Sequence, residues 1–196
     1  MIRVAIVDDH AIVRTGLRQF FSDQPDFAVV AEAASGREAV DIVRNAEVDV
    51  IVLDISMPDQ SGVDALAAIK ARAPELPVLI LSGFAESHYA TTLLRLGASG
   101  YLNKDCDPEE IVKAIRTVCR GRKYITAAVA EQLADTLGDG GDRPLHETLS
   151  ERELQVFLRL AQGETIGHMA ESLSRSVKTV STYRTRVMEK MGLASN

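Results

Sequence analysis

The chain has 196 residues, 46% of them hydrophobic and 26% charged, which is typical of globular proteins and excludes disorder as the main state. No apolar run reaches the roughly 20 residues that cross a bilayer, and the first residues lack the layout of a signal peptide, so we expect a cytoplasmic protein without a membrane partner. The net charge of −6 conceals a split, because residues 148–196 carry seven basic and five acidic side chains and the remainder carries 15 and 23. This asymmetry predicts an acidic module joined to one that meets a polyanion.

Short apolar runs, rich in β-branched residues, alternate with segments of helical spacing in the first half of the chain. The predicted strands cover residues 4–7, 27–31, 48–53, 77–81 and 101–102. Most are uniformly apolar, as strands covered on both faces are. Among the helices between them, one is closed by Gly97 and another begins at Pro108. The alternation predicts an α/β domain with a doubly wound, five-stranded parallel sheet.

The second half of the chain predicts helices only. One helix covers residues 126–137, and the breaker-rich stretch 138–144 is interpreted as an interdomain linker. Ser150 and Glu153 form a capping box for a helix that stops at Gly163. A short helix follows over residues 166–173, and Ser176 caps a third that runs to about Met191. We therefore predict one domain over residues 1–122, an extra helix and linker over 123–147, and a small all-α domain over 148–196.

Polar side chains follow four of the five predicted strands at their carboxyl ends, where open parallel sheets bind ligands. They are Asp8, Asp9, Asp54, Ser82 and Lys104. Three converging carboxylates repel one another unless a cation lies among them, and an all-oxygen set suits Mg²⁺. The alternative is that the three acids are unrelated, solvated strand ends, but the matching positions of Ser82 and Lys104 argue against it.

Asp54 lies at the centre of this set, and a carboxylate can attack a phosphoryl group to form an aspartyl phosphate. The metal and Lys104 would neutralise charge on the transferring oxygens, while Ser82 could hydrogen-bond the attached phosphate. The sequence therefore predicts a phosphate-accepting site.

Four motifs carry a resemblance to the receiver domains of two-component response regulators, which covers residues 1–122. The motifs are VDDH at 7–10, LDISMPDQSG at 53–62, LSG at 81–83 and GYLNKD at 100–105. The resemblance implies a flavodoxin-like fold, phosphorylation of Asp54, and Mg²⁺ held by Asp9, Asp54 and the Ser56 carbonyl, with Asp8 acting through water. It also implies that Ser82 and Tyr101 form a switch pair, although Tyr101 could equally be a packing residue.

The last predicted helix has an apolar face and a polar one. Val180, Tyr183, Val187 and Met191 form the face that we expect to be buried. The candidate DNA contacts are hydroxyl and cationic side chains around the opposite face, namely Lys178, Ser181, Thr182, Arg184, Thr185 and Arg186. Such a helix suits the major groove, where threonine can contact base edges or a thymine methyl and cations hold phosphates. The alternative is a surface helix with a solvated polar face.

The wider pattern of this second domain resembles the helix-turn-helix effector domains of the NarL/FixJ/LuxR type. The motifs are LSEREL at 149–154, AESL at 170–173, SVKTVSTY at 176–183 and KMG at 190–192. Gly167, Arg175 and Tyr183 depart from the usual pattern, and His168 is interpreted as a surface residue. The family continues beyond Asn196 into a fourth helix that supports dimerisation, so the resemblance implies either a shortened chain or a weakened dimer on DNA.

Together these features predict a response regulator transcription factor rather than an enzyme. The implied partners are a sensor histidine kinase, double-stranded promoter DNA, RNA polymerase and a second copy of the chain when it is phosphorylated or bound to DNA. Two alternatives stay open. One is a phosphatase that turns over an aspartyl phosphate, although Ser56 is not the general acid it would need. The other is a binding module whose acidic pocket is vestigial.

Overall fold

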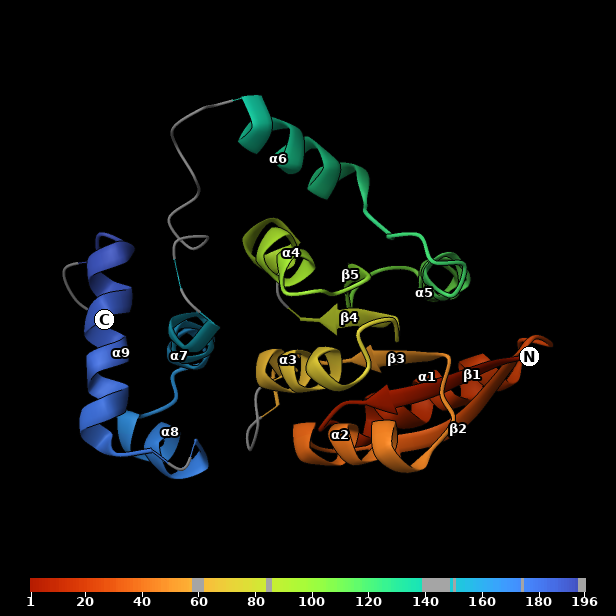
Figure 1. Ribbon diagram of the computed structural model, residues 1–196, viewed down its shortest axis with the longest axis horizontal. Coiled ribbons are helices and arrows are strands. Elements are labelled where there is room, and N and C mark those ends of the chain that lie inside the picture. Colours follow the sequence, from red (N-terminus) through yellow and green to blue (C-terminus); the bar gives the residue numbers. More distant parts are fainter. Residues whose placement is uncertain (58–61, 84–85, 139–148, 150, 174, 194–196) are drawn as a thin grey trace.

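The computed structural model describes residues 1–57, 62–83, 86–138, 149, 151–173 and 175–193 (Figure 1). In this part of the chain a five-stranded, all-parallel sheet has the order β2-β1-β3-β4-β5. The strands are β1 (Ile2–Val7), β2 (Phe27–Ala33), β3 (Val50–Leu53), β4 (Val78–Ser82) and β5 (Gly100–Asn103). The predicted fold class is confirmed, and the order is that of the flavodoxin-like sheet.

Strand β3 begins at Val50, two residues later than the sequence predicts. The carboxylate of Asp49 accepts the main-chain N–H of Arg3 at 2.7 Å and also pairs with the Arg3 guanidinium. The Asp49 side chain thus takes up the N–H of Arg3 in β1. The pairing of β1 with β3 begins one residue later, with Val4 opposite Val50.

The sheet separates two apolar cores because successive strand residues point to opposite faces. On one face, Ile6, Val52 and Leu81 pack against α1 (Ala11–Ser22) and α5 (Pro108–Val118). On the other face, Ile51 and Ile80 pack against α2 (Gly36–Asn45), α3 (Gly62–Arg72) and α4 (Glu86–Arg95). Helices on both faces explain why most of the strands are apolar throughout. Gly97 with φ +103° follows α4, and α5 begins at Pro108, as the sequence predicts. The Asp107 side chain, which accepts the N–H of Glu109, caps α5.

The chain leaves α5 along the open edge of the sheet. Tyr124 forms an isolated parallel bridge with Gly100 of β5, and its N–H donates to the Ser99 carbonyl at 2.9 Å. The next helix, α6 (Ala127–Gly138), packs against α4 and buries Val129 in the same core as Tyr101. The predicted helix is confirmed, whereas the rest of the predicted linker lies outside the described residues.

The C-terminal domain is helical. It contains α7 (Glu151–Ala161), α8 (Ile166–Ser172) and α9 (Val177–Lys190) around a small core of Val156, Met169, Ala170 and Val180. Gly163 follows α7 with φ +78°, and the Ser176 hydroxyl accepts the N–H of Thr179 at 3.0 Å to cap α9. Ser150 of the predicted capping box lies outside the described residues.

Helix α7 also packs against the first domain, beside α3 in Figure 1. The Asp64 carboxylate of α3 accepts hydrogen bonds from Arg152 and Gln155 of α7. The Tyr89 ring of α4 lies 6.4 Å, centroid to centroid, from the Phe157 ring. Leu154, Leu158 and Val187 belong to the same buried cluster as Tyr89 and Tyr101. The two domains therefore share one apolar interface.

None of the helices in the described part of the chain has the length and apolar character that a bilayer crossing needs.

Gly62 places the start of α3 directly against the residues that follow β3. A Cβ at position 62 would overlap the main-chain oxygen of Asp54 and lie 2.5 Å from the Ile55 Cα, whereas a Cβ at Gly16 in α1 would meet nothing within 4 Å. We predict that Gly62→Ala lowers the free energy of unfolding by about 1–3 kcal/mol, the usual effect of overpacking. The control Gly16→Ala should raise it by about 0.5–1 kcal/mol, because alanine suits a helix interior. Urea unfolding followed by circular dichroism measures both, and equal effects would contradict the proposed close contact.

Candidate functional site

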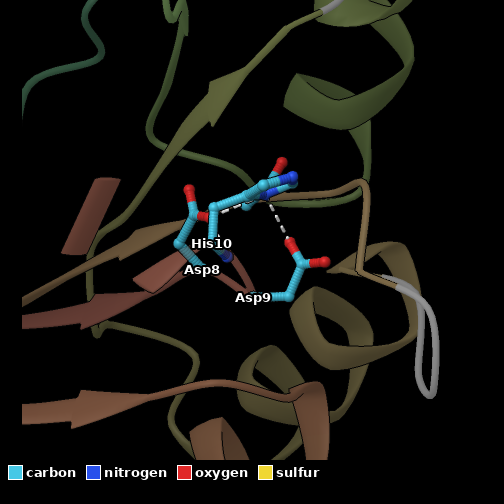
Figure 2. Close-up of side chains that lie close together, drawn as sticks. Asp8, Asp9 and His10 are labelled. Atoms are coloured by element: carbon cyan, nitrogen blue, oxygen red, sulfur yellow. Dashed lines mark hydrogen bonds and ion pairs between the residues drawn. The ribbon is translucent and has the colours of Figure 1, made fainter. Parts of the chain in front are cut away.

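An acidic cluster lies where β1 and β3 end. Asp8 and Asp54 directly follow these strands, and the Asp54 N–H donates to the Val7 carbonyl at 2.8 Å, which fixes the two ends relative to each other. One ligand atom from each of Asp8, Asp9, Asp54 and His10 lies within 4.8 Å of the others. Figure 2 shows Asp8, Asp9 and His10 close together in this cluster. The strand ends thus bring the three predicted carboxylates together.

Lys104 lies between two of these carboxylates. Its Nζ is 2.6 Å from Oδ2 of Asp8 and 2.9 Å from Oδ2 of Asp54. Its own N–H donates to the Ser82 carbonyl at 2.8 Å, so the end of β4 positions the residue. The side chains of Asp8 and Asp54 are only 3% and 1% exposed. Because buried charges are costly unless they are paired, the ammonium offsets part of the cost of burying both carboxylates.

The pKa values of the pair reflect this balance. Burial raises the pKa of Asp54 above its ordinary value, although the Lys104 ammonium and the Ser56 N–H oppose the shift. Burial would lower the pKa of Lys104, but the carboxylates of Asp54 and Asp8 outweigh it, and the net shift is upward. Lys104 therefore remains a cation at neutral pH, and Asp54 is a more basic carboxylate than an exposed one.

One oxygen of the Asp9 carboxylate is buried without a hydrogen bond. This oxygen is Oδ1, and Nδ1 of His10 lies 2.9 Å away from it. An orphaned buried oxygen is costly, and a bound cation would relieve that cost. Since the cluster offers several carboxylate oxygens, its donor set fits a hard divalent cation such as Mg²⁺.

The other predicted residues of this site lie on the adjoining segments. The Ser56 N–H donates to Oδ1 of Asp54 at 3.0 Å, so Ser56 directly neighbours the carboxylate. Ser82 is fully buried at the end of β4, next to β3 in the sheet. Tyr101 is 1% exposed and belongs to the core that α4, α6 and α7 share. Its ring is therefore buried in the core on the side of the sheet that α2, α3 and α4 cover.

Two residues near the acidic cluster were not singled out from the sequence. His10 contributes a nitrogen to the cluster, and the Arg14 guanidinium donates to the main-chain oxygen of Asp8. The position of His10 directly after Asp8 and Asp9 was the available signal. Arg14 carried none, because an arginine one turn into an amphipathic helix is ordinary.

The predicted polar face of α9 is exposed. Lys178, Thr182, Thr185 and Arg186 are exposed, whereas Ser181 and Arg184 are half-buried. Arg184 follows the buried Val180 by four residues, so it lies nearer the inner side of the helix. The predicted apolar face is confirmed, since Val180 and Val187 are fully buried and Tyr183 and Met191 are partly buried. His168 is exposed, as expected, and its Nδ1 lies 2.7 Å from the Glu164 carboxylate.

The orientation of α9 relative to the first domain leaves this polar face open. Val187 belongs to the buried cluster that includes residues of the first domain, and Met191 packs against that cluster. Lys178, Thr182 and Thr185 point to the opposite side and are exposed. Helix α9 packs against α7 and α8, and α7 is the helix that contacts α3 of the first domain. The polar face of α9, the surface that would face a polyanion, stays exposed.

Comparison with known proteins separates the chain into the same two parts. Residues 4–116 match the model of the response regulator receiver domain, and residues 147–196 match that of the bacterial regulatory proteins of the luxR family. Helices α7 to α9 lie within the second match.

Similar whole proteins combine both parts. The chain is 36% identical to the response regulator UvrY of Escherichia coli (strain K12) over 194 residues, which are 98% of this chain and 89% of UvrY. It is 35% identical to the response regulator GacA of Pseudomonas aeruginosa over 198 residues, covering 100% of this chain and 92% of GacA. A solved structure of RcsB from Salmonella enterica serovar Typhimurium, bound to promoter rprA in the presence of the phosphomimetic BeF3−, superposes with a TM-score of 0.75. That match has 25% sequence identity and covers 100% of this chain and 94% of RcsB.

These relatives are transcription-regulating response regulators rather than enzymes, which confirms the expectation that the chain is not an enzyme and removes the phosphatase alternative. Receiver domains typically bind Mg²⁺ at an acidic pocket, and this chain has such a cluster of aspartates. With its receiver domain, its LuxR-type DNA-binding domain and its similarity to UvrY and GacA over nearly all of its length, the chain belongs to the response regulators of the NarL/FixJ/LuxR family, which regulate transcription.

Proposed function

We propose that a sensor histidine kinase donates a phosphoryl group to Asp54 and that the phosphorylated chain binds promoter DNA through α9. The observation that carries the proposal is the position of Lys104, whose ammonium lies between Asp8 and Asp54 in the acidic cluster. A cation held at the nucleophile is suited to neutralise the oxygens of an incoming phosphoryl group. The site of action would be the cytoplasm, where a bacterial promoter is found.

Mg²⁺ would be held by Asp8, Asp9, Asp54 and the main-chain carbonyl of Ser56. The buried Oδ1 of Asp9, which accepts no hydrogen bond and lies 2.9 Å from Nδ1 of His10, supports this assignment. When bound, the ion would supply charge neutralisation at the phosphoryl oxygens. The chain's own residues do the rest. Asp54 would supply the attacking oxygen, Lys104 would stabilise negative charge, and the Ser82 hydroxyl would donate a hydrogen bond to the attached phosphate. Tyr101, on the strand next to Ser82, would respond by a change in its packing.

Asp54→Asn tests the phosphorylation site. We expect complete loss of phosphate incorporation from acetyl phosphate, because the amide is not a nucleophile for this chemistry. Wild-type labelling should require Mg²⁺ and stop when EDTA is added. Asp41→Asn, on the exposed face of α2, should label like the wild type. Label that still enters the Asp54 variant would refute the site, and unlabelled wild-type protein would indicate a vestigial pocket.

Helix α9 is proposed to lie in the major groove of a promoter, with Lys178 and Arg186 on phosphates and Thr182 and Thr185 on base edges. Ser181 and Arg184, which are half-buried, would contact the flanking backbone. The exposed polar face and the excess of basic residues near α9 support this placement. RNA polymerase and a second copy of the chain are the proposed protein partners on the promoter. The proposed functional division remains 1–122, 123–147 and 148–196, and the family matches at 4–116 and 147–196 support it.

Lys178→Ala tests the groove placement. We expect affinity to fall for all DNA sequences and the slope of log affinity against log salt to become shallower by about one, the loss of one phosphate contact. Lys113→Ala, an exposed lysine of α5, is the matched control and should change neither quantity. Gel-shift titrations between about 50 and 200 mM salt measure both. An unchanged slope in the Lys178 variant would contradict the assignment.

The contact between α7 and α3 offers a route from Asp54 to the DNA-binding domain. Gly62, whose N–H donates to the Ile55 carbonyl at 3.3 Å, begins α3 against the backbone of Asp54 and Ile55. Two residues later, Asp64 accepts hydrogen bonds from Arg152 and Gln155. A shift of the loop around Asp54 would therefore move the anchor of α7. We propose that this contact holds the two domains together before phosphorylation and restrains the pairing of DNA-binding domains.

Asp64→Ala tests this restraint. Removing the carboxylate leaves the buried Gln155 side chain without its partner on α3, so the domains should separate more easily. We expect a larger radius of gyration by small-angle X-ray scattering and an affinity for DNA, without phosphodonor, at least about fivefold higher. Asp41→Ala provides a control for the loss of one surface carboxylate. If the Asp64 variant separates its domains without any gain in affinity, the contact is structural only.

A further inference from the structure

The hydroxyl groups of the two exposed threonines of α9 are already engaged within the helix. Oγ1 of Thr182 donates to the Lys178 carbonyl at 2.9 Å, and Oγ1 of Thr185 donates to the Ser181 carbonyl at 3.0 Å. Both residues are exposed and lie opposite the buried Val180 and Val187. Each hydroxyl hydrogen thus points along the helix to the preceding turn. Apart from the oxygen lone pairs, the γ-methyl is therefore the group of each threonine that remains available to contact DNA.

This arrangement limits what the threonines can recognise. In the major groove, guanine offers acceptors only, and a hydroxyl whose hydrogen is occupied cannot donate to them. A methyl group contacts the C5-methyl of thymine, which no other standard base carries. Lone pairs could also accept from adenine N6 or cytosine N4, but Oγ1 is directed at the helix backbone in both residues.

The spacing of the two residues suits a pair of neighbouring bases. Side chains three residues apart on a helix are neighbours, with Cβ atoms about 5–6 Å apart. Successive base pairs rise by about 3.4 Å. Two methyl groups at this spacing match thymines one or two base pairs apart.

From these observations we infer that Thr182 and Thr185 select DNA by methyl-to-methyl contact with two thymines, and that their hydroxyl groups serve the helix rather than the bases. The inference rests on the proposed placement of α9 in the major groove. Under this inference, replacing threonine by valine should preserve recognition of the thymines, because valine keeps the methyl group. Replacing threonine by serine should abolish recognition, because serine keeps only the hydroxyl.

The test begins with duplexes selected from a random pool by the full-length wild-type chain. Each thymine of the recovered site is then replaced singly by deoxyuridine, which removes only the methyl group. We expect two positions, one or two base pairs apart, at which the replacement weakens wild-type binding about fourfold, the factor for one buried methyl group. Thr182→Ser should abolish the effect at one position and Thr185→Ser at the other, whereas Thr182→Val and Thr185→Val should retain it.

Thr117→Ser is the matched control, because Thr117 of α5 makes the same type of bond, to the Lys113 carbonyl at 2.8 Å, far along the chain from α9. It should behave like the wild type, and circular dichroism verifies that every variant is folded. Wild-type binding that ignores deoxyuridine, or valine variants that lose the preference while serine variants keep it, would overturn the inference. If the inference fails in this way but Lys178→Ala still weakens binding and lowers the salt slope, the proposed placement of α9 in the groove is unaffected. If Lys178→Ala leaves the salt slope unchanged, the placement of α9 is itself wrong.

Discussion

Two buried carboxylates held on one ammonium are the interaction on which the functional part of the molecule depends. Asp8 and Asp54 leave neighbouring strands at the same sheet edge, and Lys104 reaches both of them. Burying two carboxylates without a counter-ion would be costly, and an aspartate that accepts a phosphoryl group must be charged to act as a nucleophile. The parallel sheet, the helices on both faces and the loop after β5 together hold these three side chains in contact. The site is therefore a property of the whole domain rather than of one motif.

The same sheet edge connects the site to the second domain. Helix α3 starts against the backbone of Asp54, and its Asp64 carboxylate receives Arg152 and Gln155 from α7. The apolar part of the contact includes Tyr89, Phe157 and the core in which Tyr101 lies. The exposed polar face of α9, which we propose binds DNA, points away from this contact. Under that proposal, regulation in this chain would act on the placement of the domain, because the face is already exposed.

Much of this arrangement could be predicted from sequence because its signals are local. Uniformly apolar runs identified the strands, Gly97, Pro108 and Gly163 marked helix ends, and the polar residues after the strands indicated the acidic cluster. The contact of Asp64 with Arg152 could not be predicted, since each residue is an ordinary charged side chain on a helix surface and their pairing depends on how the domains dock. The start of β3 was missed because Asp49 pairs with Arg3, 46 residues away.

The bridge between Gly100 and Tyr124 has a consequence for how the receiver behaves as a separate unit. Strand β5 is an edge strand, and an unpaired edge is a template for association with other chains. The segment that leaves α5 covers part of that edge, and the Tyr124 hydroxyl secures it by donating to Glu110 at 3.0 Å. The connection to the second domain thus also protects β5 from edge-to-edge association. A receiver domain truncated after residue 122 would expose this edge of β5 and would be more prone to aggregation.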